Sequence, residues 1–143
     1  MQRTRDRLAA VLLLVLVSTA CGGSISDEYV IEHQPYTLEP VEGTDLQKVT
    51  LTQSASDHLG VETRPVEVRG SHLMIPYDAV FIDAHGGFWV YTNPAPLEFV
   101  RAPIEIARES STHAFLSEGP PAGTPVVTVG VPELYGSEIG FGT

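Results

Sequence analysis

Cysteine and basic side chains are both scarce in this sequence. Its 143 residues include a single cysteine, Cys21, and eight Lys and Arg against 18 Asp and Glu. One cysteine cannot form an internal disulfide, so no disulfide framework holds the fold. Without a basic cluster, the chain is not expected to bind nucleic acid.

The sequence also lacks the motifs that carry common catalytic chemistry. It has no G-x-S-x-G elbow, and the nearest string, residues 136–140, has its serine in the wrong place. Phosphate-binding and dinucleotide-binding loops and a calcium loop are missing. The carboxylates form no recognisable acid/base pair. We therefore expect no catalytic residues, no cofactor and no enzymatic activity.

No apolar run in the chain reaches the roughly 20 residues that a transmembrane helix needs. The longest, residues 8–17, follows three arginines and precedes the small residues Ser18, Thr19 and Ala20. A charged start, a short apolar centre and small residues at the end are typical of a secretory signal peptide. Residues 1–20 are predicted to be that signal.

Cys21 follows the signal directly, in the string VSTAC. This string resembles the lipobox of bacterial lipoproteins, in which the cysteine is lipidated, for example with palmitate, and becomes the first residue. We expect Cys21 to anchor the protein in the cell membrane on its extracytoplasmic face, which is the periplasmic side if the cell has two membranes. Several acyl chains give stable anchoring. The alternative is an ordinary signal peptide beside a free thiol.

Residues 21–44 are predicted to form an acidic, flexible tether. Residues 22–44 have no sustained apolar period and contain two prolines, three glycines and five acidic side chains. Removal of residues 1–20 leaves five basic and 17 acidic side chains, a formal charge of −12. Such a charge favours basic protein partners.

Residues 45–136 have the pattern of a mainly β domain. Strands are predicted over 48–52, 61–68, 75–82, 88–92, 97–106, 113–116 and 126–129. Thr52 or Ser54 can cap a short helix that ends before Gly60, and residues 132–136 can form one helical turn. We expect a small β-roll or barrel-like domain of about six strands with one short helix, then a tail over 137–143.

A hairpin is predicted over residues 75–92, with its turn at 83–87. It contains the only tryptophan of the chain, Trp89, which shares one strand face with Tyr91. An aromatic pair at this spacing is usually part of the core. If that face were open, Trp89 and Tyr91 would be a candidate partner surface.

Five histidines raise the question of a metal site. They are His33, His58, His72, His85 and His113, and no two are spaced as local metal ligands usually are. No metal ligand is therefore assigned from the sequence. A metal-binding protein stays an alternative, and it requires at least three of the last four histidines to converge.

Four segments in a fixed order resemble a known family. They are 73–80 (LMIPYDAV), 87–91 (GFWVY), 99–104 (FVRAPI) and 119–130 (GPPAGTPVVTVG). Together with 48–66 they are similar to the membrane-proximal domain of periplasmic adaptor subunits, or membrane fusion proteins, of RND-type efflux pumps. The resemblance covers residues 45–136. Pro120 stands where the family has Leu, and residues 68–72 replace the long insertion that carries the barrel, lipoyl and helical-hairpin parts.

The resemblance implies a lipid-anchored, extracytoplasmic accessory module that contacts a membrane transport complex. Its expected partners are the membrane, through Cys21, and an RND-type transporter or a full-length adaptor. The alternative is an extracytoplasmic metal-binding lipoprotein linked to metal efflux. A relic of an adaptor with no remaining role is also compatible with the sequence.

Overall fold

The structure, a computed structural model, describes residues 34–140. The predicted signal peptide, the lipidation site Cys21, the first part of the predicted tether and His33 lie outside these residues. Within residues 34–140, neither helix has the length and apolar character needed to cross a membrane.

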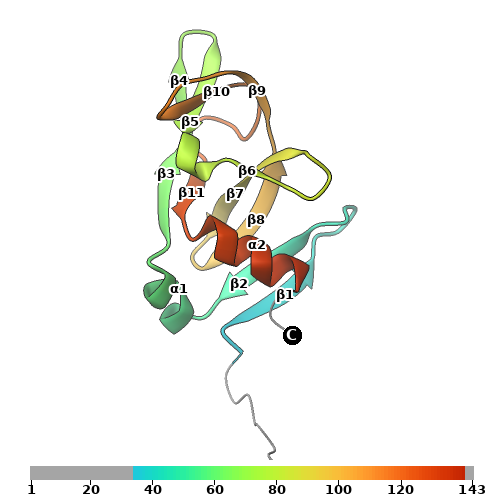
Figure 1. Ribbon diagram of the computed structural model, residues 1–143. Coiled ribbons are helices and arrows are strands. Elements are labelled where there is room, and N and C mark those ends of the chain that lie inside the picture. Colours follow the sequence, from blue (N-terminus) through green and yellow to red (C-terminus); the bar gives the residue numbers. More distant parts are fainter. Residues whose placement is uncertain (1–33, 141–143) are drawn as a thin grey trace, which may run out of the picture. The chain divides into compact units, whose positions relative to one another are not determined.

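Two antiparallel sheets make up about half of the described chain (Figure 1). The larger sheet has the order β1 (Tyr36–Pro40), β2 (Gln47–Leu51), β8 (Glu98–Pro103), β7 (Phe88–Ala95), β11 (Pro125–Val129) and β3 (Glu62–Pro65), and β6 (Phe81–Ile82) pairs with β7. The smaller sheet has the order β4 (Glu67–Arg69), β5 (His72–Pro76), β10 (His113–Glu118) and β9 (Glu105–Glu109). The prediction of a mainly β domain is confirmed.

The described residues form eleven strands, where about six were expected. Three predicted strands bend from one sheet into the other, and β1 forms within the predicted tether. Segment 61–68 divides into β3 and β4 at Val66, and segment 97–106 divides into β8 and β9 at Ile104. Segment 75–82 divides into the end of β5, the 3-10 turn η1 (Tyr77–Ala79) and β6. Val66 and Ile104 are buried at their bends, as expected where strands switch sheets at a corner.

The larger sheet is buried on both faces in its centre. Val90 and Val126 belong to the core between the two sheets, together with residues of β5 and β10. Their neighbours Tyr91 and Val127 point to the opposite face, which Val131 and Leu134 of α2 (Val131–Ile139) cover. Burial of both faces explains why β11 is a nearly continuous apolar run instead of an alternating one.

The predicted short helix is present as α1 (Gln53–Leu59). The hydroxyl of Thr52 accepts a hydrogen bond from the backbone N–H of Ala55 at 3.1 Å, and Gly60 ends the helix in the left-handed conformation. Of the two predicted caps, Thr52 is therefore the one that acts.

Two predicted boundaries are wrong in part. Residues 36–40, assigned to the tether, form β1, which pairs with β2. Most side chains of β1 are exposed, so the strand has no apolar period, and backbone pairing holds it. Residues 137–139, assigned to the tail, continue α2, where Glu138 lies on the buried face with Leu134.

Candidate functional site

The predicted hairpin turn at residues 83–87 joins β6 to β7, with Phe81 opposite Trp89 and Ile82 opposite Phe88. Its first strand is shorter than expected, because β5 belongs to the smaller sheet. Inside the turn, Asp83 Oδ1 accepts hydrogen bonds from the backbone N–H groups of His85 and Gly87, both at 2.9 Å. This side chain-to-backbone pairing, typical of aspartate in turns, fixes the loop conformation.

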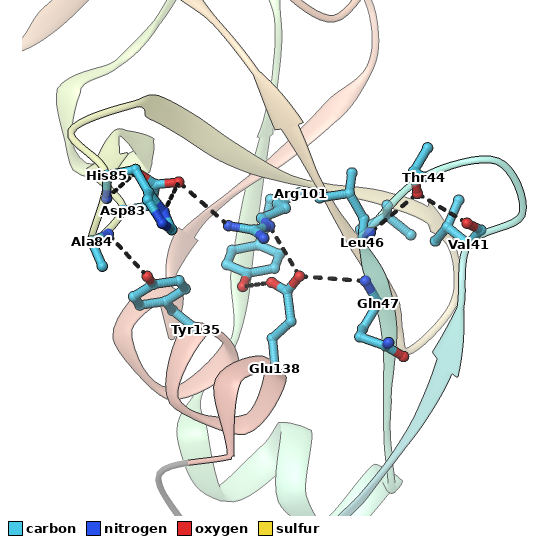
Figure 2. Close-up of polar contacts among 12 residues, drawn as sticks. Val41, Thr44, Leu46, Gln47, Asp83, Ala84, His85, Arg101, Tyr135 and Glu138 are labelled. Carbon is cyan, nitrogen blue, oxygen red and sulfur yellow. Dashed lines mark hydrogen bonds and ion pairs between the residues drawn. The ribbon is translucent and has the colours of Figure 1, made fainter.

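Four side chains from different elements meet beneath this turn, and we call Asp83, Tyr91, Arg101 and Glu138 the ionic cluster (Figure 2). Arg101 of β8 lies between the two carboxylates: its Nη1 is 3.8 Å from Asp83 Oδ2, and its Nε is 3.0 Å from Glu138 Oε1. The Tyr91 hydroxyl donates to Glu138 Oε2. The cluster therefore joins the hairpin turn, the larger sheet and α2.

Glu138 is the most deeply buried charge of the cluster, with a side chain only 3% exposed. Besides Arg101 and Tyr91, it faces the backbone N–H of Gln47 on β2, at 3.4 Å from Oε1. A carboxylate at this depth is tolerated only when it is paired and hydrogen-bonded. Nothing local to α2 predicted these contacts, so the sequence reasoning missed Glu138.

The environment shifts the pKa of two cluster members. The pKa of Asp83 lies below its usual value, chiefly because the N–H of Gly87 donates to the carboxylate, with further help from His85 and Trp89. The pKa of Tyr91 is strongly raised, because burial and the hydrogen bond to Glu138 both disfavour the phenolate. The Tyr91 hydroxyl therefore keeps its proton and donates it in the hydrogen bond to Glu138. The role of the cluster is to hold its elements together.

The predicted partner surface of Trp89 and Tyr91 is wrong for Tyr91, which is completely buried. The core interpretation holds for this residue: its ring stacks on Phe81, with 5.1 Å between the ring centroids. Trp89 is partly exposed, and the guanidinium carbon of Arg101 lies 4.6 Å from the centroid of its ring, a cation–π contact. The strand face that Trp89 and Tyr91 share is therefore largely covered by other side chains of the domain.

Next to its turn, the hairpin carries two exposed apolar side chains. Ile82 is 57% exposed and its cross-strand partner Phe88 is 40% exposed. Large apolar side chains side by side at the surface are typical of contact sites. The period of two along β7 places Phe88 on the same strand face as Val90, which is fully buried, so no local pattern marked this pair as exposed in the sequence.

A hollow of about 380 Å³ adjoins Phe88 where β8 passes into β9. Its lining residues are Gly87, Phe88, Trp89, Pro103, Ile104, Glu105 and Glu118. Gly87 gives the indole room, since a Cβ atom there would lie 2.9 Å from Trp89 Nε1. The hollow therefore combines apolar walls with two carboxylates.

The histidines that the structure describes are not gathered in one place. His58 lines a groove of about 610 Å³ beside α1, and His85 is 93% exposed in the hairpin turn. His72 Nδ1 lies 3.2 Å from the Ser71 hydroxyl, and His113 Nδ1 lies 2.8 Å from the Thr112 hydroxyl. Within residues 34–140, no three His, Cys, Asp or Glu side chains are placed to hold a metal ion. The convergence that the metal alternative requires is not found there.

Comparisons of the chain with protein families, with curated proteins and with solved structures find no match. The candidate site is therefore defined by geometry alone: an exposed apolar pair on a hairpin that an ionic cluster holds from below.

Proposed function

We propose that this protein is a lipid-anchored, extracytoplasmic interaction module that contacts a membrane transporter complex, either an RND-type transporter or a full-length adaptor. The observation that carries the proposal is the exposed pair Ile82 and Phe88 on the β6–β7 hairpin. Interfaces obtain most of their affinity from a few apolar and aromatic anchors of this kind.

The hairpin is held in place before any partner arrives. The backbone N–H of Ala84 donates to the Tyr135 hydroxyl of α2 at 3.3 Å, and Asp83 is tied to Arg101. A surface that is already ordered loses less conformational entropy on binding. A protein partner with a complementary apolar surface can therefore dock without rearranging the loop.

The distribution of charge favours a basic partner. The basic side chains of the described residues all have internal contacts. Lys48, Arg64, Arg69 and Arg101 form ion pairs with carboxylates, and Arg108 lies over the ring of Phe115. The surplus of carboxylates faces solvent. Complementary charge on a partner would speed association and select against acidic surfaces.

The test is a pull-down of the tagged full chain after extraction from its own membranes. We expect the wild type to recover a transporter or a full-length adaptor, and Phe88→Ser to recover at least about tenfold less, as for a hot-spot residue. Val68→Thr is the matched control, because Val68 is also exposed, at 60%, but lies on β4 in the smaller sheet.

A Cys21→Ala variant tests the anchor separately, and we expect it to leave the membrane fraction. Recovery of no transport component, or equal recovery by wild type and Phe88→Ser, would contradict the proposed function.

A further inference from the structure

Two glutamates that line the hollow beside Phe88 are cross-strand neighbours. Glu105 on β9 pairs with Glu118 on β10 next to a shift in the strand register, and both are exposed. Like charges directly opposite one another destabilise a sheet. Among the described residues, no Lys, Arg or His forms an ion pair with either carboxylate. The fold therefore carries a repulsive pair without an internal counter-charge.

The walls next to these carboxylates are apolar. Phe88, Pro103 and Ile104 line the hollow, and Phe88 is exposed enough to be covered by a partner. A volume of about 380 Å³ is at the small end of ligand sites, which suits one long side chain better than a large organic molecule. A hollow lined by apolar side chains and two glutamates matches a side chain with an alkyl stem and a cationic head.

We propose that this hollow binds a single Arg or Lys side chain of the partner protein. The alkyl stem packs on Phe88 and Pro103, and the cationic head pairs with Glu105 and Glu118. A guanidinium suits the site best, because it can donate to both carboxylates at once. The counter-charge that the fold lacks is supplied by the partner, which relieves the repulsion on binding.

The inference deepens the proposed function, since the hollow adjoins the exposed pair on the hairpin, but it can be tested without the natural partner. The probe is the tripeptide N-acetyl-Leu-Arg-Leu-amide, and the control peptide has Gln in place of Arg. Trp89 lines the hollow and is the only tryptophan of the chain, so its fluorescence reports on binding. The full-length protein is titrated in detergent at low salt.

We expect saturable binding of the Arg peptide, with a Kd on the order of 1 mM that weakens as salt is added. The double variant Glu105→Gln/Glu118→Gln should raise this Kd at least about tenfold. Glu109→Gln removes one charge from β9 outside the hollow, and it should leave the Kd unchanged within about twofold.

A second variant distinguishes loss of the binding site from loss of folding. Glu118→Lys places a cation opposite Glu105, so it should abolish peptide binding while the urea midpoint stays equal or rises. Equal binding of the Arg and Gln peptides, or an unchanged Kd in the double variant, would overturn the inference.

The pull-down separates the two proposals. If the double variant still recovers the transport complex as the wild type does, the basic side-chain site is wrong and the proposed function stands. If the Arg peptide binds as expected but no transport component is recovered, the proposed function fails and the site stands.

Discussion

At the scale of single residues, Glu138 connects α2 to three strands of the larger sheet. Its carboxylate contacts the backbone of β2, the hydroxyl of Tyr91 on β7 and the guanidinium of Arg101 on β8. Buried ion pairs add little net stability, but loss of one partner leaves an uncompensated charge. The cluster therefore fixes where α2 lies on the sheet.

Replacement of Tyr91 by Phe removes the hydroxyl that donates to Glu138 and keeps the stacked ring. We expect the free energy of unfolding to fall by about 1.5–3 kcal/mol, the range for hydrogen bonds to charged groups. Urea denaturation measures the change. Tyr77→Phe is the control, since Tyr77 is 41% exposed and should change stability by less than about 0.5 kcal/mol. Equal effects of the two variants would show that the buried hydrogen bond contributes nothing specific.

Asp83 makes stability depend on pH in the acid range. Its pKa in the folded protein lies below the ordinary value of 3.8, so the ionised form stabilises the fold. This contribution is fully present above the pKa that Asp83 has in the unfolded chain. It is lost as the pH falls through the lower pKa that Asp83 has in the folded protein. Asp83→Asn keeps the shape without the charge. We expect the wild type to lose more stability than this variant between about pH 5 and about pH 2, measured as urea midpoints. Equal losses of stability in the wild type and in Asp83→Asn would contradict the role given to the Asp83 charge.

At the scale of elements, contacts within its turn and from α2 hold the β6–β7 hairpin. Asp83 holds two backbone N–H groups, Tyr135 receives the N–H of Ala84, and Phe81 stacks on Tyr91. The hairpin is short, and two isolated strands of this length would be marginal in water. It is held because β7 also pairs with β8 and β11 in the larger sheet and because Tyr135 of α2 contacts the turn.

Gly87→Ala tests how tightly this element is packed. The added methyl group would lie 2.9 Å from Trp89 Nε1 and 3.4 Å from Asp83 Oδ1, so the indole or the turn must shift. We expect a loss of about 1–3 kcal/mol in the free energy of unfolding and an altered emission maximum of Trp89. Gly136→Ala is the matched control, because this helical glycine has open space around it. It should stabilise α2 by about 0.5–1 kcal/mol. Unchanged stability and emission in Gly87→Ala would show that the turn is loosely packed.

At the scale of the whole described domain, the excess of unpaired carboxylates determines which kind of partner the surface can bind. The few basic side chains pair internally, while carboxylates such as Glu105 and Glu118 have no counter-charge among residues 34–140. Both proposals follow from this imbalance and from the apolar pair beside it. An acidic, apolar face is suited to a basic, apolar partner.

The sequence by itself determined the mainly β character, the capped helix α1 and the turn at residues 83–87. Each depends on residues close together in the chain: alternating apolar side chains, Thr52 before the helix and Gly60 after it, and Asp83 beside glycine. These patterns extend over only a few positions, so they can be recognised in the sequence without the tertiary structure. The resemblance to adaptor proteins stays a prediction.

Only the tertiary structure decided where strands divide between sheets and which charges are buried together. Tyr91 and Glu138 are 47 positions apart, and Gln47 and Glu138 are 91 apart, so no local pattern connects them. β1 was missed for the same reason, because its pairing with β2 depends on backbone hydrogen bonds and not on apolar side chains. A local pattern shows which side chains can be buried. Which groups a buried side chain contacts depends on the packing of distant segments. That packing places Glu138 in contact with three strands and leaves Ile82 and Phe88 exposed side by side.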